Sequence, residues 1–150
     1  MTGPFARLRQ RRADERELGS GLWRRSHDRF ARALDRYLQV LLDERTPGSL
    51  SDAEHNGLVH AGNELTDRLA VVRDLAVHLH AAHPGDDDQH IPPATAAVHR
   101  ELSRAAHELA ATAQAVAMAR RGHGGTAAVG RHAERTLRHV DRAVELAAGL

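Results

Sequence analysis

Histidine is the residue type in this sequence that is best suited to chemistry. Twelve histidines occur with 20 acidic residues and no cysteine, so any metal site would have to use imidazole and carboxylate ligands. The densest group of such residues lies between two predicted helices and comprises His78, His80, His83, Asp86, Asp87, Asp88 and His90. Their spacing does not match the calcium-binding loop of an EF-hand. We therefore interpret the group as a solvated acidic turn, with a divalent-cation site as the alternative.

A second candidate site lies on one face of the first long predicted helix. Trp23, Phe30 and Tyr37 recur every seven residues, and His27 lies on the same face. This face could line a pocket for a small ligand, with His27 as its polar or metal-binding group. The simpler interpretation is that three large side chains fill a core otherwise made of alanine, valine and leucine.

Motifs for catalysis or nucleotide binding are missing from the sequence. His60 and Glu64 have the HxxxE spacing of a metal-binding pair, but at about 100° per residue both point away from the apolar face of their helix. There is no Gly-x-Ser-x-Gly elbow, and the glycine-rich string GHGGTAAVG follows a predicted helix instead of a strand. We therefore predict no catalytic residues, no cofactor and no enzyme activity.

The N-terminal segment is rich in arginine, which supplies all 21 basic residues of the chain. Positive charge attracts phosphate, so contact with nucleic acid or an anionic membrane is one hypothesis for this segment. Interspersed acids and the near absence of aromatic side chains favour instead a solvated arm over residues 1–20, flexible or loosely docked. The arginines of this basic arm are Arg7, Arg9, Arg11, Arg12 and Arg16.

Apolar residues at helical spacing predict four long helices in the rest of the chain. The predicted helices span about 21–45, 51–83, 93–121 and 126–149. Breaker clusters separate them, and these are Thr46-Pro47-Gly48-Ser49, Pro84-Gly85 and Gly122-His123-Gly124-Gly125. Ser51 and Glu54 predict a capping box at the start of the second helix, and Pro93 is suited to open the third.

Long helices joined by short links favour antiparallel neighbours. We therefore predict an all-α protein, an antiparallel up-down-up-down four-helix bundle over residues 21–150 behind the basic N-terminal arm. The alternative is a pair of helical hairpins completed by dimerisation. Alanine-rich surfaces of the last two helices could pack closely, in part against a second copy. The residues predicted for the core include Leu34, Leu65, Leu69, Leu102, Leu109 and Val140.

Length and charge limit the possible functions without selecting one. At 150 residues the chain fits a single domain, and without a signal peptide or an apolar membrane span we expect a cytoplasmic protein. Its arginine and alanine bias is typical of GC-rich bacterial coding sequences. Charge is segregated, with a net +5 over residues 1–36, −7 over 37–99 and +3 over 100–150. The leading hypothesis is a non-enzymatic protein that acts by self-association or by binding another protein.

Overall fold

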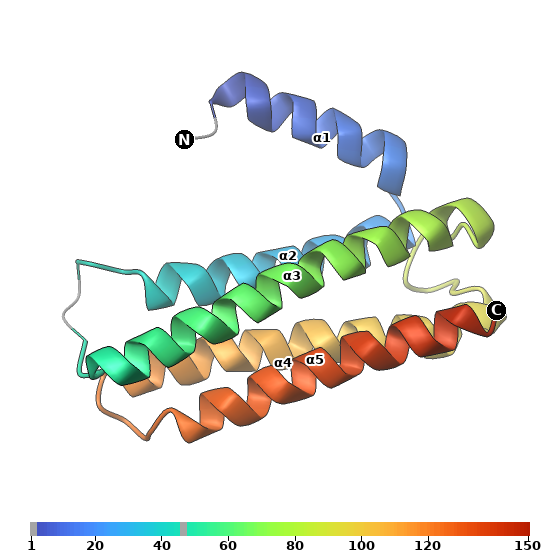
Figure 1. Ribbon diagram of the computed structural model, residues 1–150. Helices are drawn as coiled ribbons and strands as arrows, with labels where there is room; N and C mark the ends of the chain where they lie inside the picture. The colour runs from blue at the N-terminus through green and yellow to red at the C-terminus, as the bar shows by residue number, and fades with distance from the viewer. Residues whose placement is uncertain (1–2, 46–47) are drawn as a thin grey trace.

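The computed structural model describes residues 3–45 and 48–150, and these residues fold into helices without any strand (Figure 1). The predicted all-helical class is confirmed. Thr46 and Pro47, two of the predicted helix breakers, lie outside the described residues, as do the first two residues of the predicted arm. The elements are α1 (Pro4–Leu18), α2 (Leu22–Leu41), α3 (Asp52–Ala82), the 3-10 helix η1 (Pro93–Thr95), α4 (Ala96–Arg120) and α5 (Ala127–Ala148).

The ends of the helices follow the local sequence, except at the end of α2. The capping box predicted for α3 is confirmed: Ser51 Oγ accepts from Glu54 N at 3.2 Å, and Ser51 N donates to Glu54 Oε1 at 3.1 Å. Pro93 opens the 3-10 helix η1, which leads directly into α4. α2, however, ends at Leu41, four residues before the predicted end. A partner distant in sequence contributes to this early end, because the Arg120 side chain binds backbone carbonyls there.

The helices α2 to α5 pack side by side as a bundle. α2 packs against α3 and α4, and α5 packs against the same two helices. α3 and α4 therefore face each other across a diagonal, so the expectation that helices consecutive in sequence are neighbours is wrong for this pair. The chain joining them passes over the start of α2, where Leu22 N donates to Gly85 O at 2.9 Å. Around the bundle the helices therefore follow the order α2, α3, α5, α4.

The core is built of aromatic and leucine side chains from α2, of leucine and valine from α3, and of much alanine from α4 and α5. Five of the six predicted core residues are buried, and Leu69 is half-buried. Small side chains let backbones approach closely, and α4 and α5 form the most extensive helix pair. Many alanines of these helices are thus covered within the chain, among them Ala105, Ala106, Ala113, Ala133 and Ala143.

Candidate interaction surface

α1 lies outside the bundle of α2 to α5 (Figure 1). Its sequence contains all five arginines of the predicted basic arm. It spans 15 residues, yet its only buried residue is Leu18 at its end. Phe5 is 78% exposed and Leu8 45% exposed. An isolated helix of about 12 to 15 residues is marginal in water, because most helices in proteins depend on burying an apolar face. α1 is therefore the described helix with the least packing of its own.

Two acidic side chains hold α1 against α3. Arg73 on α3 donates to Asp14 Oδ1 at 2.5 Å and to Glu17 Oε2 at 2.7 Å. Burial would raise the pKa of Asp14, but the hydrogen bonds from Arg73 and Gln10 and the nearby positive charge outweigh burial and lower this pKa. Two of the acids that interrupt the basic arm, Asp14 and Glu17, therefore have a structural use, since they orient α1 on the bundle.

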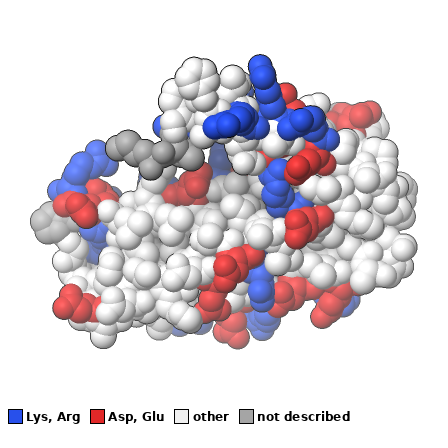
Figure 2. Space-filling view, turned by 45° about the horizontal axis from the view of Figure 1, so that its top comes forward, with Lys and Arg blue, Asp and Glu red and all other residues white. Residues whose placement is uncertain are grey.

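The opposite face of α1 points to solvent and combines arginine with apolar side chains. We call it the outward face of α1, and it consists of Phe5, Leu8, Arg9, Arg12 and Arg16. At about 100° per residue, these residues span an arc of about 100° on the side of α1 away from Asp14 and Leu18. All five are exposed, and Figure 2 shows the arginine side chains that gather over α1.

The arginines of the outward face form no ion pair with any residue that the structure describes. Arg7 and Arg11, the other two arginines predicted for the basic arm, are exposed on the same helix but outside this face, and at about 100° per residue Arg7 lies on the side of Asp14. The five arginines thus share one helix, although only three of them share the face that carries Phe5 and Leu8.

An acidic stripe runs along the exposed side of α3. Glu64, Asp67 and Asp74 are exposed on this side, and the half-buried Val71 lies between the two aspartates. Glu64 pairs with His60 at 3.1 Å, and both side chains of this HxxxE pair are solvent-accessible. In Figure 2, acidic side chains are spread over the face beneath α1. The acidic stripe, defined as Glu64, Asp67 and Asp74, therefore lies on the same molecule as the arginine-bearing outward face.

The predicted aromatic pocket is part of the packed core. Trp23, Phe30 and Tyr37 are each at most 1% exposed. Trp23 Nε1 donates to His83 O at 2.7 Å, and Tyr37 OH donates to Leu58 O at 2.6 Å, so their polar atoms bind the backbone of α3. His27 is also buried, with Nδ1 at 2.9 Å from Asp28 Oδ1.

The histidine and aspartate group does not converge on one point. Asp88 accepts both its hydrogen bonds from Arg29 at 3.0 Å, while Asp87 Oδ1 caps the turn by accepting from the backbone of Gln89 and His90. His78 is exposed on α3 and His80 is half-buried on the same helix. His83 ends α3, and Asp86 is exposed. Among the described residues, no three histidine or acidic side chains are placed to hold a metal ion.

The sequence analysis missed two histidine–carboxylate pairs between α4 and α5. His139 Nδ1 lies 2.6 Å from Glu101 Oε2, and His132 Nδ1 lies 2.7 Å from Glu108 Oε2. For Glu101, burial raises the pKa, but hydrogen bonding to His139 and nearby charge lower it overall; for Glu108, the bond to His132 lowers the pKa. Both glutamates and both histidines are seven residues apart, a signal that would have found the pairs.

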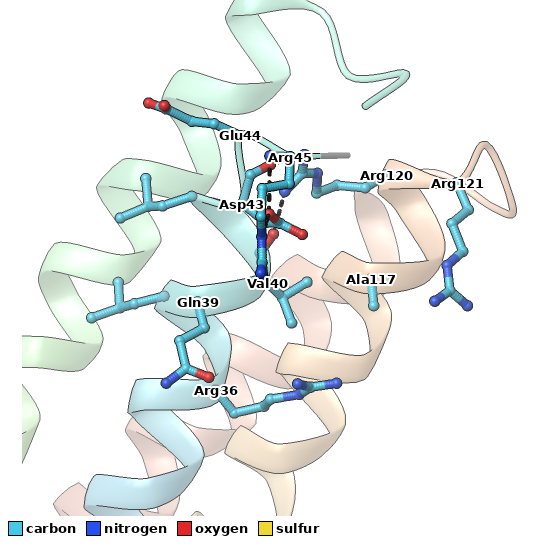
Figure 3. A pocket seen from close by; sticks show the side chains of 11 residues that line it. Arg36, Gln39, Val40, Asp43, Glu44, Arg45, Ala117, Arg120 and Arg121 are labelled. Carbon is cyan, nitrogen blue, oxygen red and sulfur yellow. Dashed lines mark hydrogen bonds and ion pairs between the residues drawn. The ribbon is translucent and has the colours of Figure 1, made fainter. Parts of the chain in front are cut away.

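The hollow drawn in Figure 3 lies between the C-terminal ends of α2 and α4 and has a volume of about 690 Å³. Arg120 reaches from α4 to the end of α2, where it donates to the carbonyls of Val40, Leu41 (3.3 Å) and Asp43 (2.7 Å). Arg121 points away from this contact. The hollow is open and its best-placed cation is committed to capping α2, so its geometry favours a structural role.

Comparison with known proteins identifies no relative. The chain matches no protein-family model, and neither curated protein sequences nor solved structures give a match. No helix in the described part of the chain has the length and apolar character needed to cross a membrane. Function must therefore be argued from the surfaces of this molecule.

Proposed function

We propose that this protein is a non-enzymatic interaction protein that docks on a macromolecular partner through the outward face of α1. The observation that carries this proposal is a helix of 15 residues with one buried residue, whose solvent side carries Phe5 at 78% exposure beside unpaired arginines. Ordering a helix costs conformational entropy that packing normally offsets. A partner that buries the outward face of α1 would offset this cost. The partner is a second copy of the chain or another protein.

The finer features of the architecture and the cellular location belong to the same proposal. In it, α2 to α5 alternate in direction, up-down-up-down in chain order although α3 and α4 are not neighbours, and α1 is the basic arm that this bundle presents. The protein acts in the cytoplasm of a bacterium. The separation of charge along the chain supports the assignment of α1 as a basic arm, since the N-terminal third is basic and the middle third acidic.

A capture experiment with matched variants tests the proposed function. The triple variant Arg9→Glu, Arg12→Glu and Arg16→Glu reverses the outward face of α1. The control variant Arg100→Glu, Arg131→Glu and Arg138→Glu makes the same change in net charge on exposed positions of α4 and α5. Each tagged protein is incubated with a lysate of the source cells containing the untagged chain, and retained proteins are identified by mass spectrometry.

We expect a partner retained by the wild type and the control variant to be lost with the α1 variant. Equal retention by all three proteins would contradict the proposal, because the outward face would then be irrelevant to binding. Circular dichroism at matched concentration verifies that the three proteins have the same helix content.

A further inference from the structure

The outward face of α1 and the acidic stripe of α3 are complementary in charge and in spacing. Arg9 and Arg16 are seven residues apart, as are Asp67 and Asp74, so on each helix the two charges are about 10 Å apart along the axis. Neither Asp67 nor Asp74 forms an ion pair with a residue that the structure describes. The two arginines of α1 and the two aspartates of α3 are thus unpaired charges of opposite sign with the same spacing along their helices.

Each of the two surfaces also has apolar side chains beside its charges. Arg9 and Arg16 lie beside Phe5 and Leu8, whereas the aspartates flank the half-buried Val71. A helix–helix contact needs some apolar area to be removed from water, because exposed ion pairs alone stabilise an association only weakly. Charge here would set the register, and the apolar side chains would supply part of the burial.

These surfaces do not meet within one chain. α1 already contacts α3 through its opposite side, where Asp14 and Glu17 bind Arg73. The outward arginines consequently point away from the α3 helix of their own chain. Contact between the two complementary surfaces requires a second molecule.

We infer that the partner that binds the outward face of α1 is a second copy of this chain. This inference rests on the proposed function of α1. In a two-fold dimer, the outward face of α1 in each copy lies on the acidic stripe of the other, so the two contacts are reciprocal and the assembly closes. A polyanion such as nucleic acid fits less well, because it would bind only the arginines of α1 and leave the acidic stripe of α3 uncompensated, whereas a second copy pairs both surfaces. Each α1 then bridges its own α3 and that of its partner.

Complementary charge reversal tests this dimer directly. One variant carries Arg9→Glu, Arg12→Glu and Arg16→Glu, and the other carries Glu64→Arg, Asp67→Arg and Asp74→Arg. The full-length proteins are studied by light scattering and sedimentation equilibrium, singly and as an equimolar mixture. The control Arg100→Glu, Arg131→Glu and Arg138→Glu tests whether net charge alone affects association, and thermal unfolding verifies that every variant folds.

The expected result is a twofold mass for the wild type and the control variant, and the 16.4 kDa mass of one chain for each reversal variant alone. Mixing the two reversal variants restores the twofold mass, because in the mixed dimer both contacts again join opposite charges. A monomeric wild type, a dimer that persists in either reversal variant, or a mixture that stays monomeric would overturn the inference. A monomer that still captures another protein through α1 leaves the proposed function intact, whereas loss of both results contradicts both.

Discussion

At the scale of single residues, polar side chains of the core tie distant segments together by binding backbone carbonyls. Trp23 binds the residue that follows the last turn of α3, Tyr37 binds the first third of that helix, and Arg120 binds the end of α2. A buried carbonyl without a partner costs about 1 to 3 kcal/mol, so each of these bonds favours one arrangement of the helices over its alternatives. Trp23 and Tyr37, which suggested a ligand pocket, therefore have a structural role in holding the helices together.

His99 has an environment that makes stability depend on pH. Its imidazole is buried with an edge contact to Trp23, and Nε2 lies 3.5 Å from Asp88 Oδ1 without a hydrogen bond. Burial lowers the pKa of His99 from its ordinary 6.5, and this outweighs the opposite effect of Asp88. Because the folded state disfavours the protonated imidazole, the titration of His99 leaves stability unchanged well above pH 6.5 and lowers it as the pH falls from that value towards the lower pKa of the folded state.

We therefore expect His99→Phe to reduce the loss of stability on acidification. Phenylalanine keeps a ring against Trp23 but cannot take up a proton, so the free energy of unfolding should change less between neutral pH and the range below pH 6.5 than it does in the wild type. Urea unfolding at a series of pH values measures this difference. The exposed His123→Ala serves as control and should follow the wild-type profile. Parallel profiles for His99→Phe and the wild type would refute the assignment.

At the scale of elements, α1 is a separate unit that a single ion-pair centre holds to the bundle. Replacing Arg73 by alanine removes the partner of both Asp14 and Glu17. We expect amide protection in α1 to fall by about tenfold or more while α2 to α5 stay protected, because little else than Leu18 holds this helix. Hydrogen exchange read by mass spectrometry resolves the two regions.

The control for this prediction is another arginine of α3. Arg68 pairs with Asp141 of α5 at 3.2 Å, so Arg68→Ala removes an ion pair from the same helix without touching α1. Its effect on global stability should be within about 1 kcal/mol, as for other partly exposed pairs. If α1 lost no protection in Arg73→Ala, or lost it equally in Arg68→Ala, packing other than the Arg73 centre would hold this helix.

Local signals predicted the elements better than they predicted how the elements meet. The capping residues Ser51 and Glu54 act within one turn, so the sequence was sufficient to place the start of α3. The end of α2 depends on Arg120, whose contacts join segments 77 to 80 residues apart, and periodicity carries no such information. Likewise, short links suggested that α3 and α4 are neighbours, whereas their connection crosses over α2. Long-range contacts determined both outcomes.

For the candidate surface, the sequence supplied the residues but not their separation into faces. Composition groups the arginines of residues 1–20 into one basic run that acids interrupt, and it does not say which of these residues share a face. In the structure Asp14 and Glu17 face α3 and three of the arginines face solvent, a division that follows from about 100° per residue once the segment is known to be helical. The low amphipathicity of this segment concealed its helix.

At the scale of the whole molecule, the separation of charge has a consequence for association. A basic helix and an acidic stripe on one chain attract a second copy and give that attraction an orientation, while a net charge of +1 leaves little overall repulsion between copies. The dimer proposed above should therefore weaken as salt screens its contacts.

Raising the salt concentration from about 0.05 M to about 0.5 M shortens the screening length from about 14 Å to about 4 Å. We expect the dimer dissociation constant to rise by roughly tenfold over this range, since the exposed pairs between Arg9, Arg16 and the aspartates lose most of their attraction. Sedimentation equilibrium at each salt concentration measures the constant. Association that strengthens with salt would instead indicate that burial of Phe5 and Leu8 dominates, because added salt favours apolar contact while it screens charge.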